Sequence, residues 1–190
     1  MDAFLLSFGV IFLAELGDKS QLMALAFATR FPAVPVLIAI SIATALVHLG
    51  SVALGVTVGL ALPANVIAIV AGLAFLVFAA WTLRGDQLGA DDEARARRET
   101  TGSVIVTVGT AFFLAELGDK TMLATITLAT DHGALGTWLG STAGMVAADA
   151  IAIAVGKFLG TRLPERSIRI GASVAFVVFG LILIWQGVRS

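Results

Sequence analysis

The five-residue string Glu-Leu-Gly-Asp-Lys occurs twice in this chain of 190 residues, at Glu15–Lys19 and at Glu116–Lys120. Each copy lies inside a long apolar run, 4–28 and 104–129. An ionisable side chain near the centre of a bilayer costs at least ~2.5–3.5 kcal/mol, so such residues are rare in membrane helices and are usually functional. Two copies at matching places predict that both contribute to one site.

The composition indicates an integral membrane protein. Hydrophobic residues make up 58% of the sequence and charged residues only 13%, whereas soluble domains carry about 25% charged residues. Cysteine is absent, which excludes disulfides, thiolate metal sites and cysteine nucleophiles. The start of the chain has no basic segment, so the first apolar run is not expected to be a cleavable signal peptide. We expect an all-α fold with six transmembrane helices, over residues 4–29, 35–60, 65–84, 103–130, 135–160 and 168–188.

Comparison of the chain with itself shows that the repeat is longer than the motif. Glu116 follows Glu15 by 101 residues, and the same offset aligns the Phe-Leu-Ala-Glu strings at 12–15 and 113–116. The offset holds without a gap across three predicted helices. The sequence therefore predicts two homologous three-helix units, 1–84 and 103–190, joined by a polar linker at 85–102 that is expected to lie in the cytoplasm.

An odd number of helices in each unit has a geometric consequence. The second unit must enter the membrane from the opposite side, so the repeats are expected to have inverted topology, as in many secondary transporters. Cytoplasmic loops are enriched in Lys and Arg, and assigning 29–35, 84–103 and 157–169 to the cytoplasm leaves only Arg189 on the other side. We therefore expect both termini to be extracytoplasmic. The basic residues on the cytoplasmic side are Arg30, Arg84, Arg95, Arg97, Arg98, Lys157, Arg162, Arg166 and Arg169.

Both motifs are expected at the midplane of the bilayer, because they lie near the middle of the first and fourth predicted spans. Glu15 and Asp18 are three residues apart and would share one face of a helix. Gly17 lies between them, and Gly118 has the equivalent place in the second copy. Glycine weakens a helix, so local unwinding is expected there, and it would free backbone carbonyls to act as ligands.

Further polar residues are expected at the same depth. A hydroxyl follows each motif, at Ser20 and Thr121, and it either ligates a cation or bonds back to the carbonyl four residues earlier. His48 and Asp149 are also 101 residues apart, and His48 equally suits an interhelical hydrogen bond. A pseudo-two-fold axis would bring these groups together. The predicted site contains five carboxylates, two lysines and one histidine: Glu15, Asp18, Glu116, Asp119, Asp149, Lys19, Lys120 and His48.

The chemistry of this set favours a hard divalent cation. Carboxylate, carbonyl and hydroxyl oxygens are the ligands preferred by Mg²⁺, Ca²⁺ and Mn²⁺. Five carboxylates against two lysines leave an excess of negative charge that cannot stay fully ionised in an empty, low-dielectric site, so protons bind. A site that takes either a cation or protons is the minimal core of an antiporter. Lys19 and Lys120 each follow their own glutamate by four residues, which favours an ion pair, and their ammonium groups are hypothesised to occupy the cluster when the metal is absent.

The extended motifs E-L-G-D-K-S at Glu15–Ser20 and E-L-G-D-K-T at Glu116–Thr121 resemble the E-x-G-D-[KR]-[ST] signature of a family of six-helix divalent cation/proton antiporters. That family includes the Golgi Mn²⁺/Ca²⁺ exchangers and the bacterial MneA-type manganese exporters, and the resemblance covers nearly the whole chain. It implies transport of Mn²⁺ or Ca²⁺ against protons in the bacterial plasma membrane, with the glutamates and aspartates of both motifs as metal ligands and no permanently bound cofactor. Met122 could add a soft ligand that suits manganese.

Several other functions are weighed against manganese export. A Ca²⁺/proton exchanger needs the same oxygen ligands, and a divalent-cation channel also uses carboxylates, although the two lysines argue against a freely conducting path. An amino-acid exporter fits the helix count, and a structural salt bridge would need only one acidic pair. Protease motifs are absent, so no enzyme activity is expected. The expected partners are the cation, protons and the lipid bilayer, with no nucleic acid; a homo-oligomer stays possible.

Overall fold

The computed structural model describes residues 2–84, 103–159 and 165–189, and its regular structure in these ranges is α-helical. The expected linker 85–102 lies outside the described residues, as do Arg95, Arg97, Arg98 and Arg162, and the side chains of Lys157 and Arg169 are likewise not described. The helices are α1 (Asp2–Glu15), α2 (Lys19–Arg30), α3 (Ala33–Ala61), α4 (Ala64–Arg84), α6 (Val104–Glu116), α7 (Lys120–Ala129), α8 (Ala134–Leu159) and α9 (Glu165–Arg189).

Four segments of the described chain are long and apolar enough to cross a bilayer. They are Ala33–Ala61, Ala64–Arg84, Ala134–Val155 and Ile170–Arg189. Helices α1 and α6, with 14 and 13 residues, are too short to cross alone. Each is followed after a short break by α2 or α7. The predicted first and fourth spans are therefore not continuous helices; each consists of two shorter ones.

The helix boundaries repeat with the offset found in the sequence. Helices α2, α3 and α4 begin 101 residues before α7, α8 and α9, and α1 ends 101 residues before α6 ends. Two equivalent residues meet at the centre of the molecule, where the hydroxyl of Thr44 donates to the sulfur of Met145 at 3.4 Å. The two halves of the described chain thus have the same order of helices and matching breaks.

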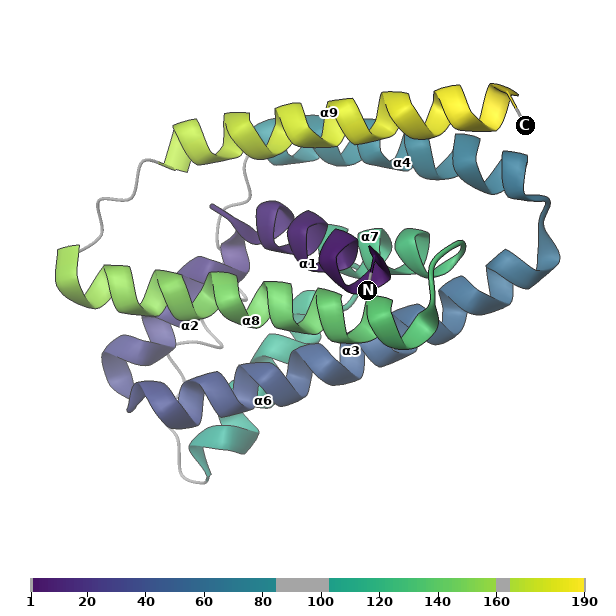
Figure 1. The fold of residues 1–190 in the computed structure, drawn as a ribbon. Helices are drawn as coiled ribbons and strands as arrows, with labels where there is room; N and C mark the ends of the chain where they lie inside the picture. The colour runs from purple at the N-terminus through teal and green to yellow at the C-terminus, as the bar shows by residue number, and fades with distance from the viewer. Residues whose placement is uncertain (1, 85–102, 160–164, 190) are drawn as a thin grey trace.

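Equivalent helices also make equivalent contacts. Helix α1 packs on α8, α6 packs on α3, and α4 packs on α9 along one side of the molecule (Figure 1). Phe75 of α4 and Phe176 of α9 lie with ring centroids 5.9 Å apart. In Figure 1 the C-terminus and the α3–α4 and α7–α8 connections lie toward one end, and the starts of α3 and α9 lie toward the other. The broken helices run between these ends through the centre.

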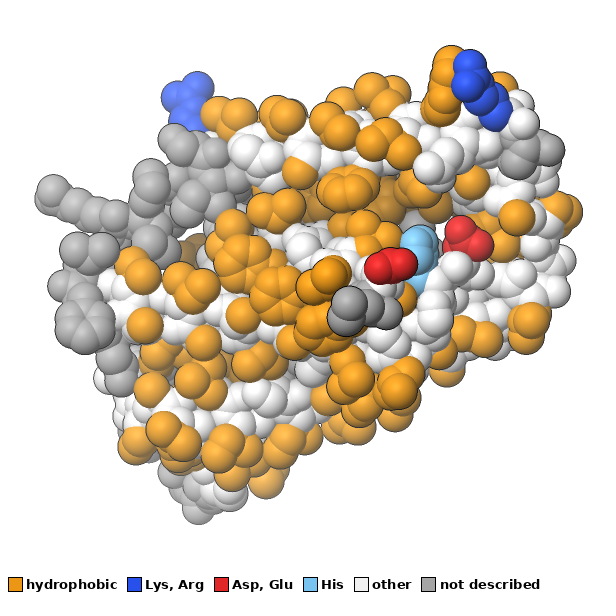
Figure 2. Space-filling view, in the orientation of Figure 1, with side chains coloured by type: hydrophobic (Ala, Val, Ile, Leu, Met, Phe, Trp, Pro, Cys, Tyr) orange, Lys and Arg blue, Asp and Glu red, His pale blue; other side chains and the backbone are white. Residues whose placement is uncertain are grey.

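The outer surface is mainly apolar. Large hydrophobic side chains point outward, including Leu60, which is 85% exposed, and Val188, which is 71% exposed. On the face drawn in Figure 2, hydrophobic side chains dominate and the few charged ones are scattered. A soluble protein rarely exposes so continuous an apolar surface, which instead matches the hydrocarbon of a bilayer. The chain is an integral membrane protein.

Candidate functional site

The two helix breaks position the predicted site. Helix α1 ends at Glu15 and α2 begins at Lys19, and the break between α6 and α7 is equivalent. Gly17 and Gly118 have φ angles of +76° and +81°, a left-handed conformation that glycine adopts without steric cost. The expected unwinding is confirmed. The expectation that Glu15 and Asp18 share a helical face is wrong, because the helix stops at the glutamate.

Each break is braced by a side chain four residues after its glycine. The N–H of Gly17 donates to Oε1 of Gln21 at 2.8 Å, and Nε2 of Gln21 donates to the carbonyl of Ala148 at 3.0 Å. In the second break the N–H of Gly118 donates to the sulfur of Met122 at 3.1 Å. Sequence reasoning missed this bracing role, although the equal spacing of Gln21 and Met122 from the glycines was a signal for it.

The acidic residues expected in the site are all buried, with exposed fractions of 2% or less. Glu15 lies within electrostatic range of Glu116, Asp18 and Asp149. Both carboxylate oxygens of Glu15 and of Asp149 lack a hydrogen-bond partner within the described ranges. The structure therefore brings together the predicted carboxylates, which are Glu15, Asp18, Glu116, Asp119 and Asp149.

Each lysine forms an ion pair with the aspartate of the other half. Nζ of Lys120 lies 2.5 Å from Oδ1 of Asp18, and Nζ of Lys19 lies 2.9 Å from Oδ1 of Asp119. For Lys19 the predicted pairing with the glutamate four residues earlier is wrong, because both carboxylate oxygens of Glu15 lack a hydrogen-bond partner in the described ranges and the break removes the helical geometry on which that spacing depends. For Lys120 the pairing with Glu116 stays a prediction. The crossed pairs differ in exposure: Lys19 is 22% exposed and Lys120 is 3% exposed.

The two hydroxyls that follow the motifs bond to carboxylates. Oγ of Ser20 donates to Oδ2 of Asp18 at 3.1 Å, and Oγ1 of Thr121 donates to Oε2 of Glu116 at 3.0 Å. Each hydroxyl thus donates to a carboxylate rather than to the carbonyl four residues earlier. Ser20 and Thr121 therefore orient acidic groups of the site in the observed arrangement.

His48 is buried on α3 but its polar contact is to a different residue. Nδ1 of His48 lies 3.4 Å from Oγ1 of Thr142 on α8. This is the interhelical hydrogen bond that the sequence left open as an alternative to metal ligation. The five carboxylates thus form the charged centre, and His48 contacts a hydroxyl on α8 instead.

The observed arrangement does not present a ready metal cage. Across residues 2–84, 103–159 and 165–189, no three acidic or histidine side chains are placed to hold one ion together. Instead, Lys120 and Lys19 each occupy one aspartate. A cation that ligates these aspartates must displace the ammonium groups. The geometry therefore makes lysine binding and cation binding competing events.

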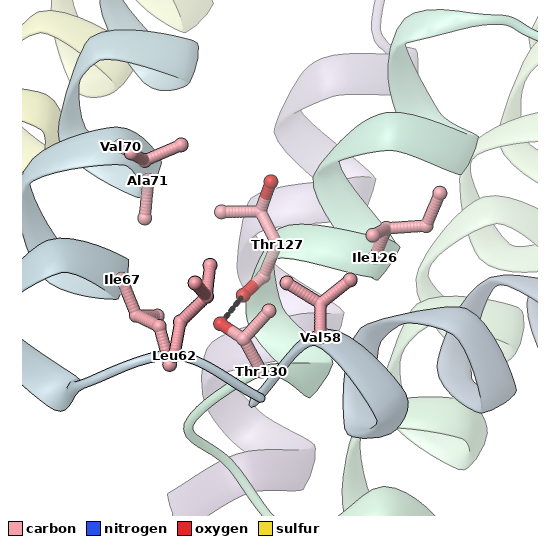
Figure 3. A pocket seen from close by; sticks show the side chains of 8 residues that line it. All are labelled: Val58, Leu62, Ile67, Val70, Ala71, Ile126, Thr127 and Thr130. Atoms are coloured by element: carbon pink, nitrogen blue, oxygen red, sulfur yellow. Dashed lines mark hydrogen bonds between the residues drawn. The ribbon is translucent and has the colours of Figure 1, made fainter. Parts of the chain in front are cut away.

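A cavity of about 120 Å³ lies apart from the carboxylates, where α3, α4 and α7 meet (Figure 3). Both of its threonine hydroxyls donate to backbone carbonyls: Oγ1 of Thr130 to that of Thr127 at 2.7 Å, and Oγ1 of Thr127 to that of Leu123 at 2.9 Å. The lining contains no charged group, so this cavity has no chemistry for a cation. It is lined by Val58, Leu62, Ile67, Val70, Ala71, Ile126, Thr127 and Thr130.

Fold and site together define a class of protein. A membrane-embedded helical bundle surrounds a buried cluster of carboxylates, reached by two broken helices and balanced by lysines, as expected of an ion transporter rather than an enzyme. The model of the family "Divalent cation/proton antiporter GDT1" matches residues 3–90 and 104–190. The chain belongs to this family of divalent cation/proton antiporters.

Curated relatives extend over nearly the whole chain. A protein of Vibrio cholerae named "Putative manganese exporter" is 33% identical over 184 residues, covering 95% of this chain and 90% of the relative. The "Divalent cation/proton antiporter GDT1" of Saccharomyces cerevisiae is 25% identical over 236 residues, covering 98% of this chain and 84% of the relative. "Protein PAM71, chloroplastic" of Arabidopsis thaliana is 32% identical over 206 residues, covering 94% and 55%. No solved structure matches the chain.

Proposed function

We propose that this protein exports Mn²⁺ from the cytoplasm in exchange for protons, through one central site to which both broken helices contribute. The observation that carries the proposal is the buried carboxylate cluster with its two crossed lysine–aspartate pairs. The family supplies the reaction class, and the manganese exporter named among the relatives supports the choice of ion.

The proposal includes six membrane crossings arranged as two inverted three-helix repeats. Helices α1 and α2 together make one crossing, and α6 and α7 together make another, each interrupted at the site. The matching helix boundaries and the contact between Thr44 and Met145 support this arrangement. The arginine distribution supports an orientation with both termini outside the cytoplasm, because the exposed Arg30, Arg84 and Arg166 all lie on the segments assigned to the cytoplasm.

The cation and protons are exchanged because they compete for the same carboxylate oxygens. A divalent cation is bound by the glutamates and aspartates of both motifs, with Asp149 and the hydroxyls of Ser20 and Thr121 as further ligands. When the cation leaves, the excess negative charge cannot persist in the low-dielectric interior, so protons bind to carboxylates. Lys19 and Lys120 hold the aspartates in the cation-free arrangement and swing away when the cation arrives. His48 couples proton movement rather than ligating the ion, and its contact with the hydroxyl of Thr142 supports this role.

Ca²⁺ is the second candidate substrate. The candidate ligands in the motifs are all oxygen atoms, which Ca²⁺ accepts as readily as Mn²⁺ does. The one soft atom near the motifs, the sulfur of Met122, accepts a hydrogen bond from Gly118 and is only partly buried. Selectivity for manganese therefore has to come from the size and flexibility of the oxygen cage.

The decisive experiment is metal-dependent proton flux in liposomes that contain only this protein. We expect a proton gradient to drive Mn²⁺ in the opposite direction, with Ca²⁺ transported more slowly and Mg²⁺ slowest. An ionophore that collapses the proton gradient, at zero membrane potential and a fixed metal gradient, should slow the transport strongly. Transport at an unchanged rate under that condition would identify a channel and contradict the proposal.

A further inference from the structure

Four buried hydroxyl groups on one side of the site have no role in the mechanism above. They are Ser7 on α1, Thr125 on α7, and Thr137 and Ser141 on α8, each with no exposed surface. None of them has a hydrogen-bond partner in the part of the chain that the structure describes. Buried polar groups are nearly always hydrogen-bonded, and helical serine and threonine commonly bond to their own backbone. One further hydroxyl of this kind, that of Thr82, lies on α4 outside the group.

The four hydroxyls lie along three helices that pack against one another, α1, α7 and α8. They belong to the half of the bundle toward the start of α1, the end of α7 and the start of α8 (Figure 1). At about 1.5 Å per residue, Ser141 and Thr137 precede Asp149 by roughly 12 and 18 Å along α8, and Ser7 precedes Glu15 by roughly 12 Å along α1. The hydroxyls therefore extend across the half of the bilayer between the carboxylates and one membrane surface.

The other half of the bundle has no hydroxyls at the equivalent positions. Shifting each of the four by 101 residues gives an aliphatic side chain, and all four of these are buried as well. Since these positions on α6, α2 and α3 are buried too, burial at such a position does not by itself require a hydroxyl. The equivalent residues, in the order Ser7, Thr125, Thr137 and Ser141, are Val108, Ala24, Val36 and Ile40.

The packing around the hydroxyls is too tight for a hydrated metal ion. A Cβ atom added at Gly144 of α8 would lie 2.6 Å from the carbonyl oxygen of Phe8 on α1. One added at Gly136 would lie 2.9 Å from Cβ of Ala3. A proton needs far less room, because it moves along a chain of hydrogen bonds. A hydroxyl can accept one hydrogen bond while it donates another, so it passes a proton on and is restored unchanged.

We propose that Ser7, Thr125, Thr137 and Ser141 form a proton-entry path from the membrane surface that carries the chain termini to the buried carboxylates. The inference rests on the proposed function, because such a path is useful only if protons are exchanged for the cation. Water molecules complete the chain between the hydroxyls, and the proton ends on a carboxylate of the site. The aliphatic residues of the opposite half offer no such chain, so the proton leaves to the cytoplasm only when the site itself opens to that side, in exchange for the cation.

The test compares two exchange reactions in the full-length protein in liposomes. Exchange of Mn²⁺ for protons needs the path, whereas exchange of labelled Mn²⁺ for unlabelled Mn²⁺ moves no net protons. The double variant Thr137→Val with Ser141→Ala removes two hydroxyls and keeps the shape of the side chains. We expect it to slow proton-coupled exchange by at least ~10-fold and to leave self-exchange unchanged. The reciprocal control, Val36→Thr, places a hydroxyl in the opposite half and should change neither rate.

Each other outcome counts against the inference. Equal slowing of both reactions would show that the hydroxyls serve packing, and no slowing of either would show that protons take another route. The conservative pair Thr137→Ser with Ser141→Thr keeps the hydroxyls and should keep the coupled rate. If the double variant does not fold, the same two exchange rates are measured for the single Thr137→Val variant. Failure of the proposed function looks different, because the unaltered protein would then move Mn²⁺ without protons.

Discussion

Two equivalent helix contacts, α1 on α8 and α6 on α3, are built differently. In the first, three glycines of α8 bring its backbone against the backbone of α1 at Phe4 and Phe8. The second has no such glycines on α3 and leaves an apolar groove of about 390 Å³ between α3 and α6. Two helix pairs that the repeat makes equivalent therefore pack differently: α1 lies closely against α8, whereas α6 and α3 leave a groove between them. The glycines are Gly136, Gly140 and Gly144, and their equivalents are Pro35, Ala39 and Ala43.

The two motifs also differ in how deeply their lysines are buried. Their five-residue strings are identical, yet Lys120 is buried against Asp18 while Lys19 keeps about a fifth of its surface exposed. The partner residue on the neighbouring long helix is His48 for one half and Asp149 for the other. The two halves of the site are therefore chemically unequal around identical motifs.

The largest expected effect tests whether the two motifs form one site. Replacing Glu15 or Glu116 by glutamine removes one anionic ligand and keeps the size of the side chain. Each single change should abolish or nearly abolish Mn²⁺ transport in liposomes, because both carboxylates bind the same ion. Residues that act as a unit are not additive, so the double variant should be little worse than either single one.

Two independent sites would give a different pattern. Each single glutamine variant would then keep roughly half of the activity, and only the double variant would be inactive. Half-active single variants would therefore contradict the one-site mechanism even if the family assignment stands. Recovery of each variant as a monodisperse protein in detergent controls for folding.

The labelling of single cysteines tests the inverted topology, because each position is expected either to react fully with the reagent or not to react. The chain has no cysteine, so single cysteines at positions 2, 90 and 190 report one place each. In intact cells, an impermeant thiol reagent added outside should label positions 2 and 190 and spare position 90, because the arginine distribution assigns 84–103 to the cytoplasm. Labelling of position 90 alone would reverse the orientation. Permeabilised cells, in which all three positions should react, supply the control.

Much of this architecture follows from sequence periodicity. The length of the apolar runs predicts long helices, and the 101-residue offset predicts where the later ones begin, as α3 and α8 illustrate. Helix breaks at Gly17 and Gly118 follow from the low helix propensity of glycine between charged residues. Gathering of the carboxylates follows from the cost of burying them separately in a membrane.

The pairings within the site could not be predicted, because they depend on how the two halves meet. The sequence favours pairing of Lys120 with Glu116, and the ion pair of Lys120 with Asp18 depends on the tertiary arrangement. The bracing by Gln21 depends on the position of the Ala148 carbonyl on a different helix. The spacing of residues along the sequence predicts which side chains meet only within a continuous helix. Here the helices end at Glu15 and Glu116, within the motifs themselves.

The crossed lysine pairs should differ in their contribution to stability. Lys120→Met leaves the buried Asp18 without its ammonium, and breaking a buried ion pair costs about 3–5 kcal/mol. Lys19→Met breaks a partly exposed pair, for which about 1 kcal/mol is typical. Thermal unfolding in detergent should therefore show a clearly larger loss for Lys120→Met. Adding Asp18→Asn to it should restore part of the loss, and equal losses for both single variants would contradict the observed asymmetry.

The smallest effect concerns the two helix contacts themselves, and here the sign should differ. At Gly144 an added Cβ would lie 2.6 Å from the carbonyl oxygen of Phe8, so Gly144→Ala must push α1 and α8 apart. We expect it to lower the free energy of unfolding by about 1–3 kcal/mol, as overpacking does.

At Gly109 of α6, an added Cβ would lie 3.6 Å from the carbonyl oxygen of Ala39, which is ordinary van der Waals contact. Gly109→Ala removes a residue of low helix propensity, so it should be neutral or should stabilise the protein by up to about 1 kcal/mol. Both variants make the same chemical change at helix–helix contacts that the repeat makes equivalent. Thermal unfolding measured side by side should lower the midpoint for Gly144→Ala and leave it unchanged or raise it for Gly109→Ala. Equal destabilisation would mean that the α3–α6 contact is as tight as the α1–α8 contact, and the asymmetry between the halves would then have to lie in the site alone.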